Sequence, residues 1–461
     1  MTYDEALAFW YGQINYEHKT PKTGDFTLDR MRALVRLLGN PQDRLRIVHV
    51  AGSKGKGSTS AMLASILRRA GYRVGLFTSP HLVRVEERMQ IDGVPITREE
   101  LASLLTEVRT AVEAGKLEPT FFEIATAVGF LHFVRRKVEL ALVEVGLGGR
   151  LDSTNVCHPL VSVITSISHD HTQMLGSELA SIAAEKAGIV KPGVPVVSGT
   201  TVPEARAVIE RTCRERNAPH WQRGADFGYE YEAGKEDQEG SVPPRVRVLS
   251  TQYSVPSTRF SRHDRDVPPM YELGLLGEHQ AANAAVAVAV VERLRAGGLH
   301  VPEGAVRTGL ATVHWPARLE VVGRHPLVVL DCAHNVASAS ALVQTLETSF
   351  PATRRSLVFA CSGDKDLTGI FEVLAPHFQH VFLTAYAGST RTVPPERLAE
   401  ILRSAASVPA TVHPCASDAW RAARGKACPD ELICITGSVF LAGELRPLLV
   451  GSTHSLACAS G

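Results

Sequence analysis

The sequence lacks the features that mark secreted, membrane-spanning and nucleic-acid-binding proteins. Its eight cysteines are scattered with no Cys-x-x-Cys pair, which argues against a zinc site or a disulfide framework and suits reduced thiols. No apolar run approaches the roughly 20 residues that span a bilayer, and the acidic start of the chain has no signal-peptide pattern. The net charge of +1 provides no overall attraction for nucleic acid or for a membrane surface. We therefore expect a cytoplasmic protein with small-molecule partners and neither nucleic acid nor membrane as a partner.

The chain is long enough for two domains, and its pattern is that of an α/β protein. Its 461 residues exceed one ordinary core, and 44% hydrophobic with 21% charged residues is typical of a globular protein. Apolar runs alternate with amphipathic stretches, which predicts a mostly parallel sheet covered by helices. The strands expected in this first sheet are residues 45–51, 73–78, 139–145, 161–167 and 194–198.

The later part of the chain divides into three stretches. Residues 222–272, rich in charge, Pro and Ser, predict strands or loops that decorate the first domain, and an alanine-rich helix follows from Gln280 to Ala296. Gly and Pro punctuate residues 301–318, which predicts a linker between a first domain of residues 1–300 and a second of 319–461. The second domain is expected to be a smaller, Rossmann-like α/β sheet with strands near 327–331, 356–361, 380–384, 410–413 and 432–436.

A glycine-rich loop after the first strand predicts a nucleotide site. The run from Ile47 to Ala51 leads into the turn, and a helix is expected from Thr59 to Arg69. Such loops bind phosphate through backbone N–H groups, the helix N-terminus and a lysine, and ATP is the first candidate. The pattern is irregular, because Val50 stands where glycine is usual, so an empty glycine-rich turn stays an alternative. The nucleotide-binding candidates are Gly52, Ser53, Lys54, Gly55, Lys56, Gly57 and Ser58.

Other polar residues follow apolar strands, where ligands of α/β sheets bind. Glu144 is a candidate Mg²⁺ ligand, or a capping or salt-bridged glutamate. The segment 165–172 has two histidines and an aspartate that suit a metal or a bound water, or form a polar turn. Lys186 falls near a helix C-terminus, where the dipole alone would account for it. The segment 331–335 suits ribose or phosphate, or caps a helix.

Taken in order, these motifs resemble the folylpolyglutamate synthase/dihydrofolate synthase family, a branch of the Mur ligase superfamily. The resemblance runs from about residue 25 to 445. Any single motif is weak, but a dozen in the family's order are specific. They are Val50–Ser58, Thr78–Leu82, Glu87–Ile91, Phe122–Glu123, Glu144–Gly149, Asp170–Thr172, Glu185–Ile189, Gly277–Gln280 with Asn283, Trp315–Glu320, Asp331–Asn335, Asp364–Asp366 and Thr436–Ser438.

The resemblance implies a catalytic group and a metal site in the first domain. Lys56 would hold the β- and γ-phosphates of ATP. Ser79 and Glu144 would bind one Mg²⁺, and Glu144 with His171 would help to bind a second. Lys186 in this family can be carbamylated, which would turn a cation into a metal-facing carboxylate.

The remaining implied roles concern the nucleotide and the substrates. Gln280, Asn283, Arg318 and Asp331 would hold adenosine and phosphates from the side of the second domain. His334, counted with the catalytic residues, would lie near the phosphates or the incoming glutamate, and Phe122 and Glu123 near the pterin. The chain departs from the family at Ser53-Lys54, where Thr-Asn is usual, and at Cys332, where a smaller residue is commoner.

The implied activity is ATP-dependent ligation of L-glutamate to a pteroate or folate carboxylate through an acyl phosphate, in a protein expected to be a monomer. The sequence does not distinguish addition of the first glutamate from addition of later ones. Two alternatives stay open: another Mur-type amino-acid ligase, and a nucleotide-controlled binding protein without catalysis. A nucleotide-controlled binding protein would need no second metal site.

Overall fold

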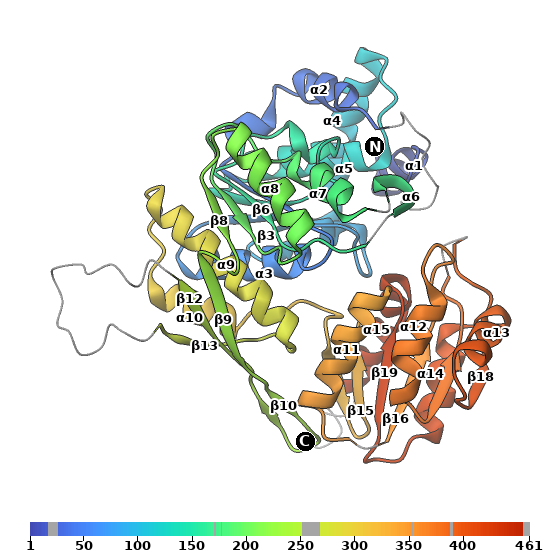
Figure 1. The fold of residues 1–461 in the computed structure, drawn as a ribbon. Helices are drawn as coiled ribbons and strands as arrows, with labels where there is room; N and C mark the ends of the chain where they lie inside the picture. The colour runs from blue at the N-terminus through green and yellow to red at the C-terminus, as the bar shows by residue number, and fades with distance from the viewer. Residues whose placement is uncertain are drawn as a thin grey trace, which may run out of the picture. The chain divides into compact units, whose positions relative to one another are not determined.

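The chain forms two compact units in a computed structural model that describes residues 1–16, 26–169, 172–176, 178–250, 268–352, 354–387 and 391–454 (Figure 1). Unit 1 comprises Met1–Glu230, Val246–Glu272 and Gln280–Val313. Unit 2 comprises Tyr231–Arg245, Leu273–His279 and His314–Gly461. Among the residues described, no helix is long and apolar enough to cross a membrane.

Unit 1 is built on an eight-stranded sheet with the order β4-β3-β2-β5-β1-β6-β7-β8. All pairs are parallel except β2–β3 and β3–β4. The predicted α/β class and all five predicted strands are confirmed. Because β1 lies between β5 and β6, the loop after β1 is flanked by the ends of both neighbours. The strands are β1(Ile47–Ala51), β2(Val74–Phe77), β3(Met89–Ile91), β4(Val94–Pro95), β5(Leu140–Glu144), β6(Val161–Ile164), β7(Val196–Ser198) and β8(His220–Gln222).

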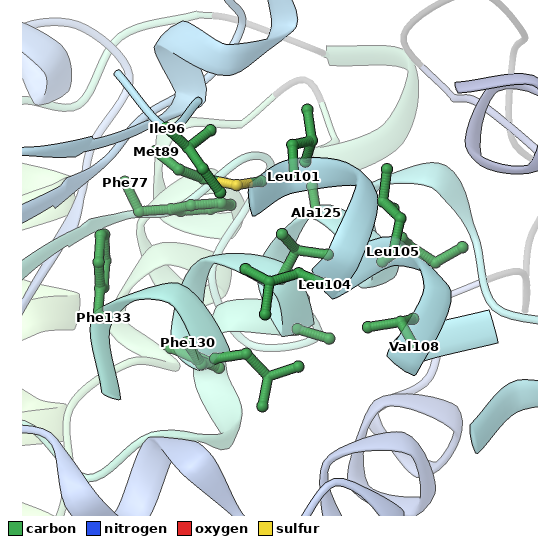
Figure 2. Close-up of a cluster of buried hydrophobic side chains, with 14 of the residues drawn as sticks. Phe77, Met89, Ile96, Leu101, Leu104, Leu105, Val108, Ala125, Phe130 and Phe133 are labelled. Carbon is green, nitrogen blue, oxygen red and sulfur yellow. The ribbon is translucent and has the colours of Figure 1, made fainter. Parts of the chain in front are cut away.

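Helices of unit 1 bury their apolar faces against this sheet and one another. Figure 2 shows the cluster in which α4 side chains such as Leu104 meet Phe130 of α5, with Phe77 and Met89 contributed by the strands. The end of β2 and the start of β3 are therefore anchored in the core. The helices are α1(Tyr3–Tyr11), α2(Leu28–Leu37), α3(Lys56–Arg69), α4(Arg98–Gly115), α5(Phe121–Arg135), α6(Thr172–Leu175), α7(Leu179–Ala187), α8(Pro203–Glu215), α9(Glu278–Ala296) and α10(Glu303–Ala311).

The segment predicted to decorate the first domain contributes to both units. Strands β9(Phe227–Glu232), β12(Arg245–Ser250) and β13(Met270–Glu272) form a sheet in the order β13-β12-β9. The hairpin of β10(Lys235–Glu236) and β11(Ser241–Val242) belongs to unit 2, where Arg324 pairs with Glu236 at 3.1 Å and donates to the Gly240 carbonyl at 3.0 Å.

Unit 2 has a six-stranded sheet with the order β14-β15-β19-β16-β17-β18, in which β14 alone pairs antiparallel. The five predicted strands are present, and β14 is an addition. The strands are β14(Glu320–Arg324), β15(Leu327–Leu330), β16(Arg355–Phe359), β17(His380–Leu383), β18(Ala410–Val412) and β19(Leu432–Thr436). The helices are α11(Val336–Ser349), α12(Leu367–Leu374), α13(Pro395–Ala405), α14(Ala416–Lys426) and α15(Val439–His454).

Half of the stretch expected to be a linker, residues 303–311 of 301–318, is a packed helix. Helix α10 begins after Pro302, which stands at its N-cap, and a Cβ at Gly309 would lie 2.5 Å from the Ile66 Cα of α3. Ser65 donates to the Gly309 carbonyl at 2.8 Å. Pro302, one of the residues that predicted a linker, thus stands at a helix start, and the division between units falls at His314.

Candidate active site

The glycine-rich loop leaves the central strand β1 and enters α3. The helix begins at Lys56, three residues before the predicted start, because Gly55 takes the N-cap position with a φ of +85°. Its first turn of intrahelical bonds opens with Thr59 N–H donating to the Gly55 carbonyl at 2.9 Å. The N–H groups before Thr59 therefore precede the helical ladder, which makes this turn suited to an anion.

The segment after β6 fixes the backbone of this loop. Ser53 N–H donates to the Ser166 carbonyl at 2.7 Å, and the Lys54 carbonyl accepts from Thr165 Oγ1 at 2.6 Å and from Ser166 Oγ at 3.0 Å. Ser53 Oγ donates to the Ser168 carbonyl at 2.9 Å. The hydroxyl-rich start of the segment predicted to bind metal or water therefore holds the phosphate loop, a role that sequence reasoning missed.

Two lysines converge on one carbonyl of the loop. Lys56 Nζ lies 3.2 Å and Lys186 Nζ 3.1 Å from the Gly52 oxygen, although Lys186 comes from the C-terminal end of α7. Lys186 is 3% exposed. Its position near a helix C-terminus is as expected, but the helix dipole does not by itself explain a side chain that is buried and directed at the phosphate loop.

Glu144 and Ser79 meet beside the loop. Glu144 ends β5, pairs in register with Val50 of β1 and is buried, and its Oε2 accepts from Ser79 N–H at 3.3 Å. A carboxylate with an adjacent serine is an oxygen donor set of the kind Mg²⁺ takes. His171 and Asp170 lie outside the described residues, and within the described part of the chain no group of three His, Cys, Asp or Glu side chains forms a metal cluster.

The two residues predicted to lie near the pterin differ in their surroundings. A Cβ at Gly146 would lie 2.5 Å from the Phe122 Cζ, so this ring packs on the glycine-rich turn after Glu144. Glu123 is engaged in the N-terminal cap of α5, where its Oε2 accepts from Thr120 N–H at 2.7 Å and pairs with Arg30 at 3.3 Å. Phe122 is thus the better placed of the two for a ring contact, while Glu123 has a structural role.

Asp152 supports the turn that follows Glu144. Its buried carboxylate accepts from Leu147 N–H at 2.9 Å and from Thr154 N–H at 3.0 Å. Burial raises the pKa of Asp152, and these hydrogen bonds oppose that shift. Thr154 Oγ1 also contacts His49 Nε2 of β1 at 2.8 Å, and burial lowers the pKa of His49 to about 3, which keeps the imidazole neutral. Sequence reasoning missed these contacts. The feature that could have indicated them is an aspartate, Asp152, just after the glycine-rich turn.

Gln280 and Asn283 lie in unit 1, not on the side of the second domain as predicted. Both come from α9, and Asn283 Nδ2 donates to Gln280 Oε1 at 3.0 Å. A Cβ at Gly55 would lie 2.2 Å from Asn283 Oδ1, so the helix packs directly on the phosphate loop. Helix α9 belongs to unit 1 along nearly its whole length, because residues 280–313 pack there.

The other predicted nucleotide residues gather at one end of the unit 2 sheet. Asp331 follows β15, and its carboxylate accepts from Leu319 N–H at 3.1 Å and Ala333 N–H at 2.7 Å. This fixes the turn that carries Arg318. His334 is half-buried, with Nδ1 2.8 Å from the Cys332 carbonyl. Asn335 caps α11, so the capping interpretation is confirmed for that residue.

Nearly the whole chain is similar to known ligases. Residues 50–291 match the Mur ligase middle domain, and residues 317–439 match the Mur ligase, glutamate ligase domain. The dihydrofolate synthase/folylpolyglutamate synthase of Bacillus subtilis is 35% identical over 97% of this chain and 99% of its own length. The folylpolyglutamate synthase of Lacticaseibacillus casei is 35% identical over 98% of this chain and 99% of its own.

Solved structures agree with these relatives. E. coli FolC in complex with DHPP and ADP superimposes with a TM-score of 0.82 at 29% identity, covering 98% of this chain and 99% of that one. Mycobacterium tuberculosis folylpolyglutamate synthase complexed with ADP and AMPPCP gives a TM-score of 0.81 at 33% identity, covering 92% and 95%. The order of motifs, the two-unit fold and this full-length similarity lead to one conclusion: the chain belongs to the folylpolyglutamate synthase/dihydrofolate synthase family of Mur ligases.

Proposed function

We propose that the chain is an ATP-dependent ligase that adds L-glutamate to dihydropteroate, to the γ-carboxylate of (tetrahydro)folate, or to both. The observation that carries the proposal is the Glu144–Ser79 contact beside a phosphate loop on which Lys56 and Lys186 converge. A nucleotide switch needs the loop but not this additional group of polar side chains. The E. coli relative, solved with DHPP and ADP, supports a pterin-type acceptor.

The reaction has two steps, each with a balanced transfer. An oxygen of the pteroate or folate carboxylate attacks the γ-phosphorus of ATP, the bond to the β-phosphate oxygen breaks, and ADP leaves an acyl phosphate. The amine of glutamate then attacks the acyl carbon, inorganic phosphate leaves, and the nitrogen loses a proton. Phosphorylation is needed because a carboxylate is a poor electrophile, and the protein contributes mainly positioning and charge neutralisation.

The residues of the site divide these tasks. The loop residues from Gly52 to Ser58 surround the phosphates, and Gly55 to Ser58 offer them N–H groups, because those of Ser53 and Lys54 already bind Ser166. Lys56 neutralises the phosphate charge, and Lys186 stands beside it. Gln280, Asn283, Arg318 and Asp331 hold the rest of the nucleotide, His334 faces the phosphates or the glutamate, and Phe122 contacts the pterin. Mg²⁺, when bound, neutralises phosphate charge, and Ser79, Glu144 and His171 would hold it.

The test is a direct assay with the purified chain. ATP, Mg²⁺ and glutamate are supplied with either dihydropteroate or tetrahydrofolate, and release of phosphate is compared with formation of glutamylated product. Release that depends on dihydropteroate alone, on tetrahydrofolate alone or on both identifies the glutamate that is added. Release that no pterin stimulates would contradict the folate proposal, and full ligase activity in Lys56→Ala would contradict the assignment of the phosphate loop.

Two further expectations belong to the same proposal. The protein acts as a monomer in the cytoplasm, where its substrates are small molecules and its thiols stay reduced. Light scattering of the purified chain at several concentrations tests the first, since a mass near twice 49.8 kDa would contradict it. Fractionation of the source cells tests the second.

A further inference from the structure

Arg88 is a charged side chain held entirely inside unit 1. It has no exposed surface and stands immediately before β3. A guanidinium is costly to remove from water unless its surroundings compensate, so its contacts are informative about what it holds in place. Two of the segments that Arg88 contacts carry residues of the proposed site.

The first segment is the loop from Thr78 to His81, which carries Ser79. The Arg88 carbonyl accepts from Thr78 N–H at 3.0 Å, and its side-chain Nε donates to His81 Nδ1 at 2.9 Å. Arg88 therefore holds this loop on both sides of Ser79. The arrangement is rigid because Phe77 and Met89 pair in register and are both buried in the cluster of Figure 2.

The second segment is the first turn of α5. The guanidinium carbon of Arg88 lies 5.2 Å from the ring centroid of Phe121, within the range of a cation–π contact. Phe121 is itself fixed by Trp10, which stacks at 4.8 Å and donates from Nε1 to the Phe121 carbonyl at 2.9 Å. The residue that follows Phe121 is Phe122, so Arg88 contacts the immediate neighbour of the proposed pterin residue.

We infer that Arg88 is a positioning residue that fixes the Ser79 loop against the start of α5, and so sets the metal-binding serine relative to Glu144 and the pterin side. This inference rests on the proposed roles of Ser79 and Phe122. A planar guanidinium with a directed Nε–H suits both contacts at once, whereas a lysine ammonium in its place loses the fork geometry and the stacking.

The experiment measures metal binding without turnover. Mn²⁺ is titrated, in the presence of ADP, into the full chain and followed by electron paramagnetic resonance. Arg88→Lys and His81→Ala are expected to bind Mn²⁺ about tenfold more weakly, as supporting residues around metal ligands typically do. His81→Asn is expected to bind like the unaltered chain, because its Oδ1 can accept from the Arg88 Nε in place of Nδ1. Arg98→Lys is the matched control, since Arg98 makes a cation–π contact with Tyr3 at 5.2 Å but is 62% exposed.

The outcomes separate this inference from the proposed function. Ser79→Ala is measured alongside. Weak Mn²⁺ binding in Ser79→Ala together with normal binding in His81→Ala would overturn the role of Arg88 and leave the metal assignment standing. Normal binding in Ser79→Ala would overturn the metal assignment and the inference with it. If Arg88→Lys does not fold, the pair His81→Ala and His81→Asn decides, and equal binding by the two rejects the inference.

Discussion

Replacing Gly52 with alanine should disable nucleotide binding, and the structure indicates by how much. The new Cβ would lie 1.9 Å from Thr165 Oγ1, whereas ordinary contact begins at 3.4 Å, so either this hydroxyl or the loop must move by about 1.5 Å. The backbone nitrogens of Thr165 and Ser166, at 3.1 and 3.2 Å, are also closer than ordinary contact. The backbone φ of +149° is also one that side chains rarely adopt, which costs roughly 1–3 kcal/mol. The carbonyl that moves is the one on which Lys56 and Lys186 converge. Because a hydrogen bond to a charged group is worth about 1.5–3 kcal/mol, and about 1.4 kcal/mol is tenfold in affinity, losing one such bond to the phosphates should weaken binding of a nonhydrolysable ATP analogue by about 10–100-fold.

The control separates this clash from simple backbone strain. Gly71 has a φ of +94° and nothing within 4 Å of its ideal Cβ, so Gly71→Ala should lower stability and leave nucleotide binding unchanged. Combining Gly52→Ala with Thr165→Ala removes the hydroxyl in the clash and should restore part of the affinity. Calorimetric titration of the unaltered chain and the three variants provides the comparison. Equal binding by Gly52→Ala and Gly71→Ala would refute the reasoning, as would the absence of any recovery in the double variant.

Three further changes test separate features. Glu144→Gln should weaken Mn²⁺ binding in the presence of ADP by roughly 10–100-fold without lowering the melting temperature, and unchanged binding would count against a metal role. His49→Gln should remove one source of the pH dependence of folding stability. The pKa of His49 is about 3 in the folded chain and 6.5 in the unfolded chain, so the stability that the neutral imidazole contributes is fully present above pH 6.5 and is lost as the pH falls. Urea unfolding should show the native chain losing about 3 kcal/mol more than the variant between pH 7 and pH 4. Asp331→Asn, which weakens the acceptor of the Leu319 and Ala333 N–H groups, should raise the KM for ATP about tenfold by the loss of one or two hydrogen bonds, and an unchanged KM would contradict its placement in the nucleotide site.

Most of the sheet architecture could be predicted because its strands are apolar on both faces. In parallel sheets covered by helices, strands such as β5 form continuous buried runs, which are visible without alignment. Strand β14 was not predicted, since it stands at a sheet edge and all five of its residues are only partly buried. Pro302 favoured a linker in the sequence because proline is common both in linkers and at helix starts, and in the structure it stands at the N-cap of α10.

The residues of the candidate site also differ in how far the sequence alone predicts them. Residues such as Lys56 and Glu144 could be proposed from the sequence because their chemistry suits a ligand and their position after a strand is local information. Thr165 and Asp152 instead form hydrogen bonds with other protein groups. Which groups lie within reach depends on β1 lying between β5 and β6, and the sheet order cannot be read from the local sequence. The side of the molecule on which Gln280 lies depends in the same way on where a helix packs.

The departure at Ser53-Lys54 can be understood from the way the loop is held. Fixing the backbone of one residue costs roughly 1–2 kcal/mol of conformational entropy. In this loop the backbone is already fixed in the folded chain without nucleotide, because Ser166 and Thr165 bind its N–H and C=O groups. Lys54 contributes its backbone N–H and C=O to this frame, and the family's asparagine carries the same two groups. At the preceding position Ser53 retains the hydroxyl that a threonine would supply, and uses it to bind the Ser168 carbonyl. The bonds that hold the loop thus use a hydroxyl at position 53 and backbone groups at position 54, and Ser53-Lys54 supplies both.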